Sequence, residues 1–436
     1  MRRDMNFNRR QMLKGVSAGT LAALSGCSDS GSSDGETVGE PRLDDAIKLG
    51  ILAPYPEDYT VGVDLVNAVN LAADQHNDAG GILGTEFETV VANTKMAPAT
   101  AREEHRRLTF EEESDLTIGV WLGIVLQSMM ESMAQQETLH ITAGSAENQP
   151  IDLINEDYER YKYHFRSHMN MDHALAATNQ FTEFAADKYG WERAAVITED
   201  LEVLDPLGEP YVNEISDYLD VPVFERTSTG QTDWNPLWDR LENADVDVAL
   251  VFLVITGVTA VAQWAKQERD FQMGGMHVPS MVSEFWEETD GLCEGLFAMN
   301  LVTPQTANTP RTQPFVQDYK DEFGFVPGAH TAGAGYDTVN LYAQALRAVG
   351  SRHPDDLIPH LEEMVFTDGV MQDRIDFYDK DEKWPHDPKW ESWSTTGLPV
   401  FFQWQKADNE RGGAMECVAP TQYQTAEFQQ PPWLRE

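Results

Sequence analysis

The feature that most constrains the fold is an alternation of short apolar segments with longer segments of helical periodicity. Residues 46–52 form a β-rich run that ends before Pro54. From Val61 to His76, apolar residues recur at the three- and four-residue spacing of a helix, and Asn-Asp-Ala-Gly-Gly at 77–81 ends it. A second strand is expected at 87–92. Because parallel strands are joined by helical crossovers, this order predicts parallel sheets with helices on both faces.

The same order continues along the rest of the chain. Further strands are expected at 115–120, 139–142, 194–198, 223–226, 246–253 and 399–404, and further helices at 127–137, 172–189, 211–218, 234–242, 258–268, 333–349 and 357–364. Two parallel sheets, one from each half, account for the length of 436 residues. The sequence therefore predicts an α/β protein built as two doubly wound parallel-sheet lobes.

The first 27 residues resemble an export signal and are not expected to be part of the fold. Paired arginines at 9–10 precede an apolar run at 15–24 that is half the roughly 20 residues a membrane span needs. The pair resembles a twin-arginine export signal, and Leu-Ser-Gly-Cys at 24–27 resembles the lipobox of lipoproteins. This resemblance implies lipidation of Cys27 and an anchor on the outer face of the cell membrane. Residues 28–44 are expected to be a flexible tether. A chance cysteine in a cytoplasmic protein is the alternative.

The net charge of the chain limits the kinds of molecule that it can bind. The chain holds 73 Asp and Glu against 31 Lys and Arg, for a net charge of -42, and the acidic residues are spread along its length. This favours an acidic surface over a folded core, in the style of salt-loving archaea, where salt screens self-repulsion. It excludes a nucleic-acid partner, because no basic patch is present. Cys293 and Cys417 either form a disulfide or are two buried thiols.

Three landmarks carry a family resemblance: the Asn-Asp-Ala-Gly-Gly-Ile-Leu-Gly segment at 77–84, Phe-Arg-Ser at 165–167 and Thr-Gly-Gln-Thr-Asp-Trp at 229–234. In this order they resemble the type I periplasmic-binding-protein family, in the branch of branched-chain amino-acid/amide-binding proteins that feed ABC importers. The resemblance covers roughly residues 45–405. It implies a multi-strand hinge between the lobes, a small-molecule ligand in the cleft, delivery to importer permease subunits, no cofactor, no metal and no enzymatic activity.

The resemblance also implies how the chain is divided. Lobe 1 is expected from residues 45–165 plus about 300–365, and lobe 2 from 166–299 plus about 366–405. Residues 406–436 are then a C-terminal extension.

Open α/β sheets bind ligands at the carboxyl ends of their strands, so the residues after each strand are the candidate ligand contacts. Tyr55 follows the first strand and Trp121 the third. The family usually places serine hydroxyls for a ligand carboxylate just after this third strand, but none occurs before Ser128. Carboxylate capture would then fall to the backbone N–H groups of Gly123 and Ile124, or the ligand has no carboxylate there.

Further contacts are expected from both halves. Gly144, Ser145 and Ala146 form a small-residue loop after the next strand, and Asp200 and Thr256 follow strands of the second half.

The ligand is expected to be a branched-chain or related amino acid, with an amide or urea as the alternative. In amino-acid-binding relatives a glutamate pairs with the ligand ammonium, and the resemblance places Glu284 in that role. An exported enzyme and a sensory ectodomain are the competing classes. Against the enzyme, the sequence after the signal and the tether holds no Gly-x-Ser-x-Gly, His-Glu-x-x-His or phosphate-loop motif.

Two metal sites are minor alternatives. His164, His168 and His173 have spacings of four and five residues that do not share one face. An acidic cluster lacks the glycine and terminal glutamate of a calcium loop; it comprises Asp376, Asp379, Asp381 and Glu382.

Overall fold

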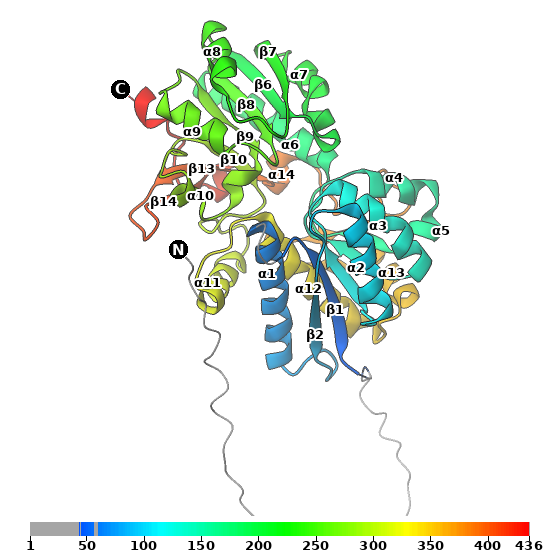
Figure 1. Cartoon of the computed structure of the whole chain (residues 1–436). Coiled ribbons are helices and arrows are strands. Elements are labelled where there is room, and N and C mark those ends of the chain that lie inside the picture. Colours follow the sequence, from blue (N-terminus) through cyan, green and yellow to red (C-terminus); the bar gives the residue numbers. More distant parts are fainter. Residues whose placement is uncertain (1–42, 44, 56–59, 436) are drawn as a thin grey trace, which may run out of the picture. The chain divides into compact units, whose positions relative to one another are not determined.

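A computed structural model describes Leu43, residues 45–55 and residues 60–435. The arginine pair, Cys27 and nearly all of the tether lie outside these residues. No described helix combines the length and hydrophobicity that a membrane crossing requires. The described residues form two α/β lobes, which confirms the predicted fold class (Figure 1).

The first sheet is wholly parallel, with strand order β2-β1-β3-β4-β5. Its strands are β1 (Ile47–Ala53), β2 (Phe87–Asn93), β3 (Leu116–Gly119), β4 (His140–Thr142) and β5 (His164–Arg166). Side chains of β1 alternate between two cores. Leu49 and Ile51 pack in the larger one, and Leu52 packs in a smaller one beneath α2 (Pro98–Phe110) and α3 (Gly123–Gln136). Helices therefore cover both faces, as the pattern of apolar runs predicts.

Eight helices accompany this sheet in the described residues: α1 (Thr60–Asp78), α2 (Pro98–Phe110), α3 (Gly123–Gln136), α4 (Gln149–Glu156), α5 (Tyr158–Tyr161), α11 (Thr312–Phe323), α12 (His330–Val349) and α13 (Pro354–Glu363). Helix α1 packs against α12 so closely that a Cβ at Gly335 would lie 2.7 Å from Leu65 Cδ1. The buried Asp64 carboxylate accepts hydrogen bonds of 3.0 Å from the N–H groups of Gly328 and Ala329, just before α12. These contacts join segments that are about 260 residues apart in the sequence.

The second sheet is mixed, with strand order β14-β13-β10-β9-β8-β6-β7. Its strands are β6 (Arg193–Glu199), β7 (Asp220–Thr227), β8 (Val248–Leu253), β9 (Gln272–His277), β10 (Phe297–Asn300), β13 (Val400–Lys406) and β14 (Gly413–Ala419). Five strands are parallel, as predicted, whereas β13 runs antiparallel to β10, and β14 antiparallel to β13. Strand β14 lies within the expected C-terminal extension, and here it forms the edge of the second sheet.

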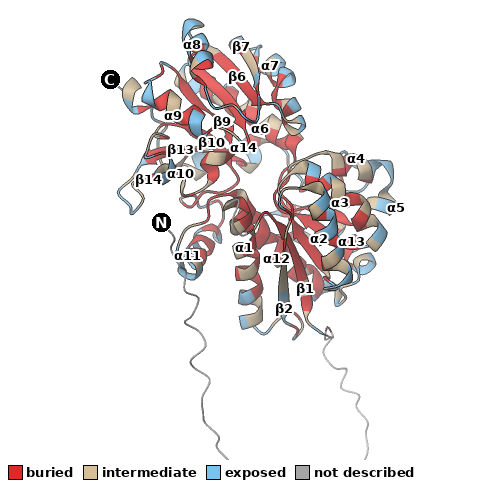
Figure 2. Ribbon diagram, in the orientation of Figure 1, coloured by how far each residue is buried: buried red, intermediate tan, exposed pale blue. Residues whose placement is uncertain are grey.

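The helices of the second lobe are α6 (Met171–Tyr189), α7 (Glu209–Ile215), α8 (Asn235–Asn243), α9 (Val258–Lys266), α10 (Phe285–Glu288) and α14 (Trp393–Thr396), with short 3₁₀ turns at η1 (Glu202–Leu207), η2 (Val278–Met281), η3 (Thr421–Tyr423) and η4 (Pro432–Leu434). Phe181 of α6 stacks on Phe401 of β13 with ring centroids 3.6 Å apart. Strands β6 and β8 are buried, whereas helices such as α8 expose one face (Figure 2).

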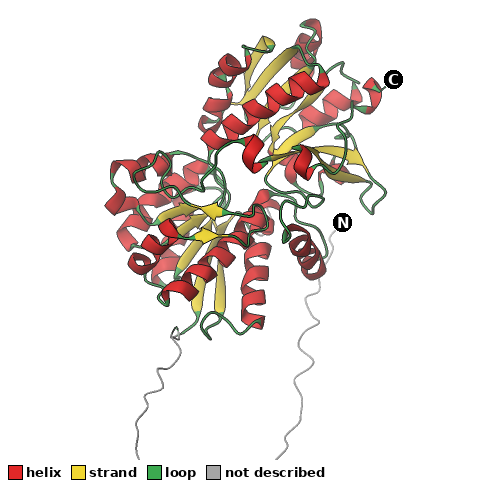
Figure 3. Ribbon diagram, turned by 180° about the vertical axis from the view of Figure 1, so that it is seen from behind, coloured by secondary structure: helices red, strands yellow, loops and turns green. Residues whose placement is uncertain are grey.

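The chain passes between the two lobes three times: between β5 and α6, between β10 and α11, and between α13 and β13 (Figure 3). The third passage includes the two-stranded ribbon of β11 (Val365–Phe366) and β12 (Ile375–Asp376). Three connections agree with the multi-strand hinge that the family resemblance implies.

The structure accounts for one helix that was not predicted and settles the alternative for the cysteines. Helix α2 was not predicted, because charged residues such as Arg102 and Glu103 hide a narrow apolar stripe of Ala101 and Leu108. Cys293 and Cys417 are both free and buried, so they are the two buried thiols rather than a disulfide. Burial raises the pKa of each thiol to about 12, which keeps both protonated and unreactive at neutral pH.

Candidate ligand-binding site

A cavity of about 110 Å³ lies where the strand ends of both sheets meet. It is lined by loop and helix residues of both lobes: Trp121, Leu122, Gly123, Gly144, Ser145, Ala146, His168, Met169, Met171, Ala174, Val203, Leu204, Val254, Met276, Val278, Met281, Met299, Asn300, Leu301 and His330. An apolar cavity of about 150 Å³ holds one benzene molecule, so this cavity suits a ligand of about one ring or one short branched chain.

The first lobe supplies an aromatic wall. Trp121 lies two residues after the end of β3, and its ring lies 5.5 Å from that of His330 at the start of α12. The His330 ring lies 5.3 Å from that of His168, in the first passage between the lobes. Gly144 lets the β4 loop approach closely, because a Cβ there would lie 2.7 Å from the carbonyl oxygen of Val120.

Hydrogen bonds fix the proton positions on both histidines. His168 Nδ1 lies 2.9 Å from the carbonyl oxygen of Met169, and His330 Nε2 lies 3.2 Å from that of Gly144. Since a carbonyl only accepts, these nitrogens carry the protons, and His168 Nε2 and His330 Nδ1 are acceptors. Burial lowers the pKa of His330 to about 4 and that of His168 well below 6.5, so both rings are neutral. His168 Nε2 is buried and has no hydrogen-bond partner among the described residues.

The second lobe supplies a flexible apolar wall. Met276, Met281 and Met299 come from β9, η2 and β10, and Val254 follows β8. Met171, at the start of α6, continues this wall. Methionine has three rotatable bonds and a polarizable sulfur, so a methionine wall adapts to ligand shape better than branched side chains do.

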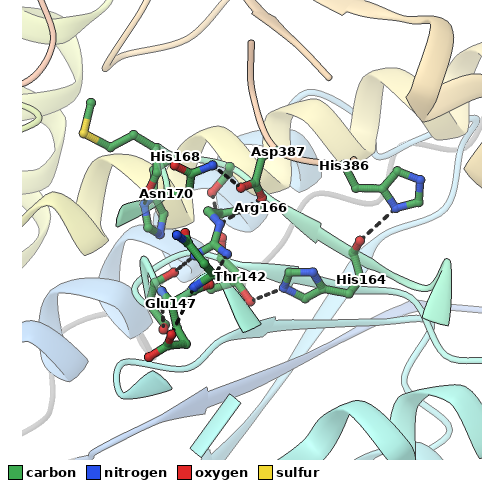
Figure 4. Close-up of polar contacts among 12 residues, drawn as sticks. Thr142, Glu147, His164, Arg166, His168, Asn170, His386 and Asp387 are labelled. Carbon is green, nitrogen blue, oxygen red and sulfur yellow. Dashed lines mark hydrogen bonds and ion pairs between the residues drawn. The ribbon is translucent and has the colours of Figure 1, made fainter. Parts of the chain in front are cut away.

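No Asp, Glu, Lys or Arg lines the cavity among the described residues. The buried cation behind the β4 loop is Arg166, and each of its three side-chain nitrogens donates a hydrogen bond within the protein (Figure 4). Its Nε lies 2.9 Å from Asp387 Oδ1, its Nη2 donates to the Glu147 carbonyl at 2.6 Å, and its Nη1 donates to the Ser145 carbonyl. Arg166 therefore holds the loop that lines the cavity instead of offering charge to a ligand.

A carboxylate of the protein lies at the start of α3. The Glu147 side chain lies against Gly123 so closely that a Cβ at Gly123 would be 2.6 Å from Glu147 Oε2. Burial raises the pKa of Glu147, while its hydrogen bond to the Asn148 N–H and the charge of Arg166 lower it. A carboxylate at a helix N-terminus is favoured by the partial positive charge there. Glu147 thus lies beside Gly123, one of the two residues whose N–H groups were expected to receive a ligand carboxylate.

A second carboxylate fills the equivalent place in the other lobe. The buried Glu199, at the end of β6, accepts hydrogen bonds from three consecutive N–H groups after β8. These bonds come from Val254 and Ile255 at 2.8 Å each and from Thr256 at 2.6 Å. Backbone N–H groups in such a row form an anion-binding nest, and here the chain occupies the nest itself.

The structure brings together five of the residues that the sequence pointed to. Trp121, Gly123, Gly144, Ser145 and Ala146 all line the cavity. Their spacing after strands β3 and β4 was the signal, because the ends of neighbouring parallel strands meet at one edge of the sheet.

The other five predicted contacts do not line the cavity. Tyr55 is half-buried beside Asn93, and Ile124 is 61% exposed. Asp200 pairs with Arg226 at 2.9 Å, with its side chain 71% exposed. Thr256 gives its N–H to Glu199, and Glu284 lies 3.5 Å from Arg411.

Sequence reasoning missed the methionine wall and the two histidines. Met276 and Met299 lie within or at the end of strands rather than after them, and His330 starts a helix of the first lobe. Of the missed residues, His168 follows the Phe-Arg-Ser landmark and Met281 lies in the turn η2 after β9, so the strand-end rule could have found both.

The two minor metal alternatives gain no geometric support. His164 Nε2 lies 3.0 Å from Thr142 Oγ1, whereas His173 packs against Trp384 and Trp390. In the described part of the chain, no three His, Cys, Asp or Glu residues are grouped as a metal site.

Comparison with known proteins agrees with this architecture. Residues 46–387 match the family described as periplasmic binding protein. A search of the curated proteins found no match to the chain. The chain belongs to the periplasmic binding protein family, a class of solute-binding proteins that are not enzymes.

Solved structures share the fold at low sequence identity. An ABC transporter substrate-binding protein from Sphaerobacter thermophilus superposes with a TM-score of 0.70 at 17% identity, covering 86% of this chain and 97% of that one. The branched-chain amino acid transporter substrate-binding protein LivJ from Streptococcus pneumoniae, in complex with isoleucine, gives 0.68 at 16% identity, covering 86% and 100%. A solute-binding protein of an ABC transporter from R. palustris, in complex with 4-hydroxybenzoate, gives 0.70 at 13% identity, covering 87% and 98%.

Proposed function

We propose that this protein is an exported lipoprotein that captures one small solute between its lobes and delivers it to an ABC importer. The main support for the proposal is the cavity. Residues of both lobes line it, so it is enclosed only when the two lobes lie together. Ligand binding then shifts the population toward a closed form that importer subunits recognise.

The cargo proposed from sequence was a branched-chain amino acid, with an amide as the alternative. One similar structure holds isoleucine and another holds an aromatic acid, so the fold accommodates different chemistries. In this chain Glu284, the expected partner of an amino-acid ammonium, is directed to Arg411 outside the cavity. The amide alternative needs no such partner and fits the apolar walls better.

Titration calorimetry at molar salt, with L-isoleucine and isovaleramide as probes, tests the binding function. We expect saturable one-to-one binding of one of them. Ala174→Phe should abolish it, because Ala174 lines the cavity from α6. Ala176→Phe on the same helix is the matched control, since Ala176 does not line the cavity. Turnover of the probe in place of stoichiometric binding would contradict the proposal.

The anchor is tested separately through Cys27. Replacement by serine removes the proposed site of lipidation, and a lipoprotein held by acyl chains should then be released into the medium. Fractionation of cells that express wild type or Cys27→Ser measures this, and unchanged membrane retention of the variant would argue against lipid anchoring.

A further inference from the structure

Carboxylates of the chain itself lie at strand-end loops of both lobes, where an anionic ligand could otherwise bind. In the second lobe Glu199 takes the three N–H groups that follow β8. In the first lobe the Glu147 side chain lies against Gly123 at the start of α3, and its carboxylate accepts a hydrogen bond from the Asn148 N–H at 3.2 Å. Gly123 and Val254, one at each place, line the cavity.

Resting on the proposed function, we propose that Glu147 and Glu199 stand where a ligand carboxylate would bind and restrict the cargo to uncharged molecules. The class that fits is a small alcohol, phenol or primary amide with an apolar body. A carboxylic acid or a zwitterionic amino acid would have to displace one of these side chains or lie beside its charge.

Electrostatics supports this restriction. Two like charges a few ångströms apart repel strongly where water is scarce. The nearby cation cannot compensate, because Arg166 is paired with Asp387 and bonded to two carbonyls. No lysine or arginine lines the cavity among the described residues. An anionic ligand would therefore gain no counter-charge for the water it loses.

The hydrogen-bonding capacity of the cavity supports the ligand class. His168 Nε2 is a buried acceptor without a partner in the described part of the chain, and a buried polar atom left unpaired is costly. Asn300 offers little, because its Nδ2 donates to Gly328 and its Oδ1 accepts from Leu301. A ligand that donates one hydrogen bond to His168 and buries its apolar body against the methionines would satisfy the site.

Calorimetry with isosteric pairs tests the proposal on the full chain in 1 M KCl at pH 7.5. The pairs are isovaleramide with isovalerate and benzamide with benzoate. Members of a pair share shape and differ in charge, so their affinity ratio isolates the carboxylate. We expect the amide to bind at least ten-fold more tightly. A carboxylate that binds as tightly as its amide would overturn the proposal and leave the solute-binding function intact.

Two variants assign the effect to the first lobe. Glu147→Gln should strengthen isovalerate binding several-fold and leave isovaleramide within two-fold, because it removes charge while keeping the side-chain volume. Glu284→Gln is the matched control, since Glu284 is also half-buried but pairs with Arg411 outside the cavity. If both variants change the ratio equally, Glu147 has no special role and the proposal fails.

His168→Phe tests the acceptor. It keeps a ring of similar size and removes Nε2, so isovaleramide binding should weaken by about three- to ten-fold, the range of one neutral hydrogen bond. A melting curve at the same salt verifies that the variant is folded. Unchanged affinity in a folded variant would show that the ligand does not bond to His168.

Discussion

The two walls of the cavity are built on different principles. The first-lobe wall is aromatic, with Trp121 after β3 and His330 at the start of α12, beside the β4 loop that Arg166 holds. The second-lobe wall is made of thioether side chains such as Met276 and Met299 over backbone fixed by Glu199. The two lobes therefore have different roles toward a ligand. The first-lobe wall sets the direction of its hydrogen bonds, and the second-lobe wall adapts to its shape through apolar contacts.

The largest expected effect concerns the support of the first wall. Arg166→Met leaves the buried Asp387 without a counter-charge and should lower the free energy of unfolding by about 3–5 kcal/mol. Arg226→Met is the control, because the Arg226–Asp200 pair is largely exposed and should cost less than about 1 kcal/mol. Urea unfolding of both variants measures this. Equal losses would mean that Arg166 does not hold the first wall.

A pH experiment compares one buried histidine from each lobe. Burial lowers the pKa of His330 in the first lobe and of His277 in the second to about 4. Between pH 6.5 and 4 the unfolded chain binds more protons at these positions than the folded chain does. Each histidine therefore costs stability as the pH falls through this window, about 3 kcal/mol at pH 4, because its pKa is 6.5 in the unfolded chain and about 4 in the folded one.

The difference between wild type and a variant isolates each histidine. Burial raises the pKa of Asp64 to about 6 and that of Asp337 to about 7, and these two groups titrate in the opposite sense. Urea unfolding of wild type, His277→Gln and His330→Gln from pH 8 to pH 4 should show each variant gaining on wild type as the pH falls. A constant difference across this range would contradict burial of that histidine in its neutral form.

A smaller effect concerns the nest of the second wall. Glu199→Ala leaves three N–H groups without their acceptor and should lower the free energy of unfolding by about 2 kcal/mol, in the range for hydrogen bonds to charged groups. Added formate should restore part of the loss, because the emptied nest can bind a small carboxylate. Glu202→Ala, an exposed neighbour, is the control and should be neutral and insensitive to formate. A Glu199→Ala protein as stable as wild type would contradict the claim that Glu199 stabilises the backbone of the second wall.

Much of the fold could be predicted from sequence, because apolar periodicity reports which faces are buried. The β1–α1–β2 order was readable from Ile51 and Leu65 and their neighbours, and it is confirmed. The antiparallel pair β13 and β14 could not be read, because a strand pattern such as Val400–Lys406 carries no direction. Pairing direction is set by tertiary contacts such as the stacking of Phe181 on Phe401.

The site was only half predictable for a related reason. The strand-end rule found Trp121 and Ser145, which sit on loops at one sheet edge. It could not show that Glu199, an ordinary residue of a strand, turns its carboxylate to the loop after β8. Long-range polar contacts of this kind have no local periodicity, and in a chain with 73 acidic residues composition does not single one out.

The most direct test of an uncharged ligand is to identify the small molecule that is bound to the native protein. Protein purified from its own cells without refolding is unfolded in guanidinium, and the released small molecules are identified by mass spectrometry and compared with the Ala174→Phe protein. We expect one uncharged compound with a hydroxyl or amide group, near one per chain, that is missing from the variant. An equimolar free amino acid or carboxylic acid would contradict it.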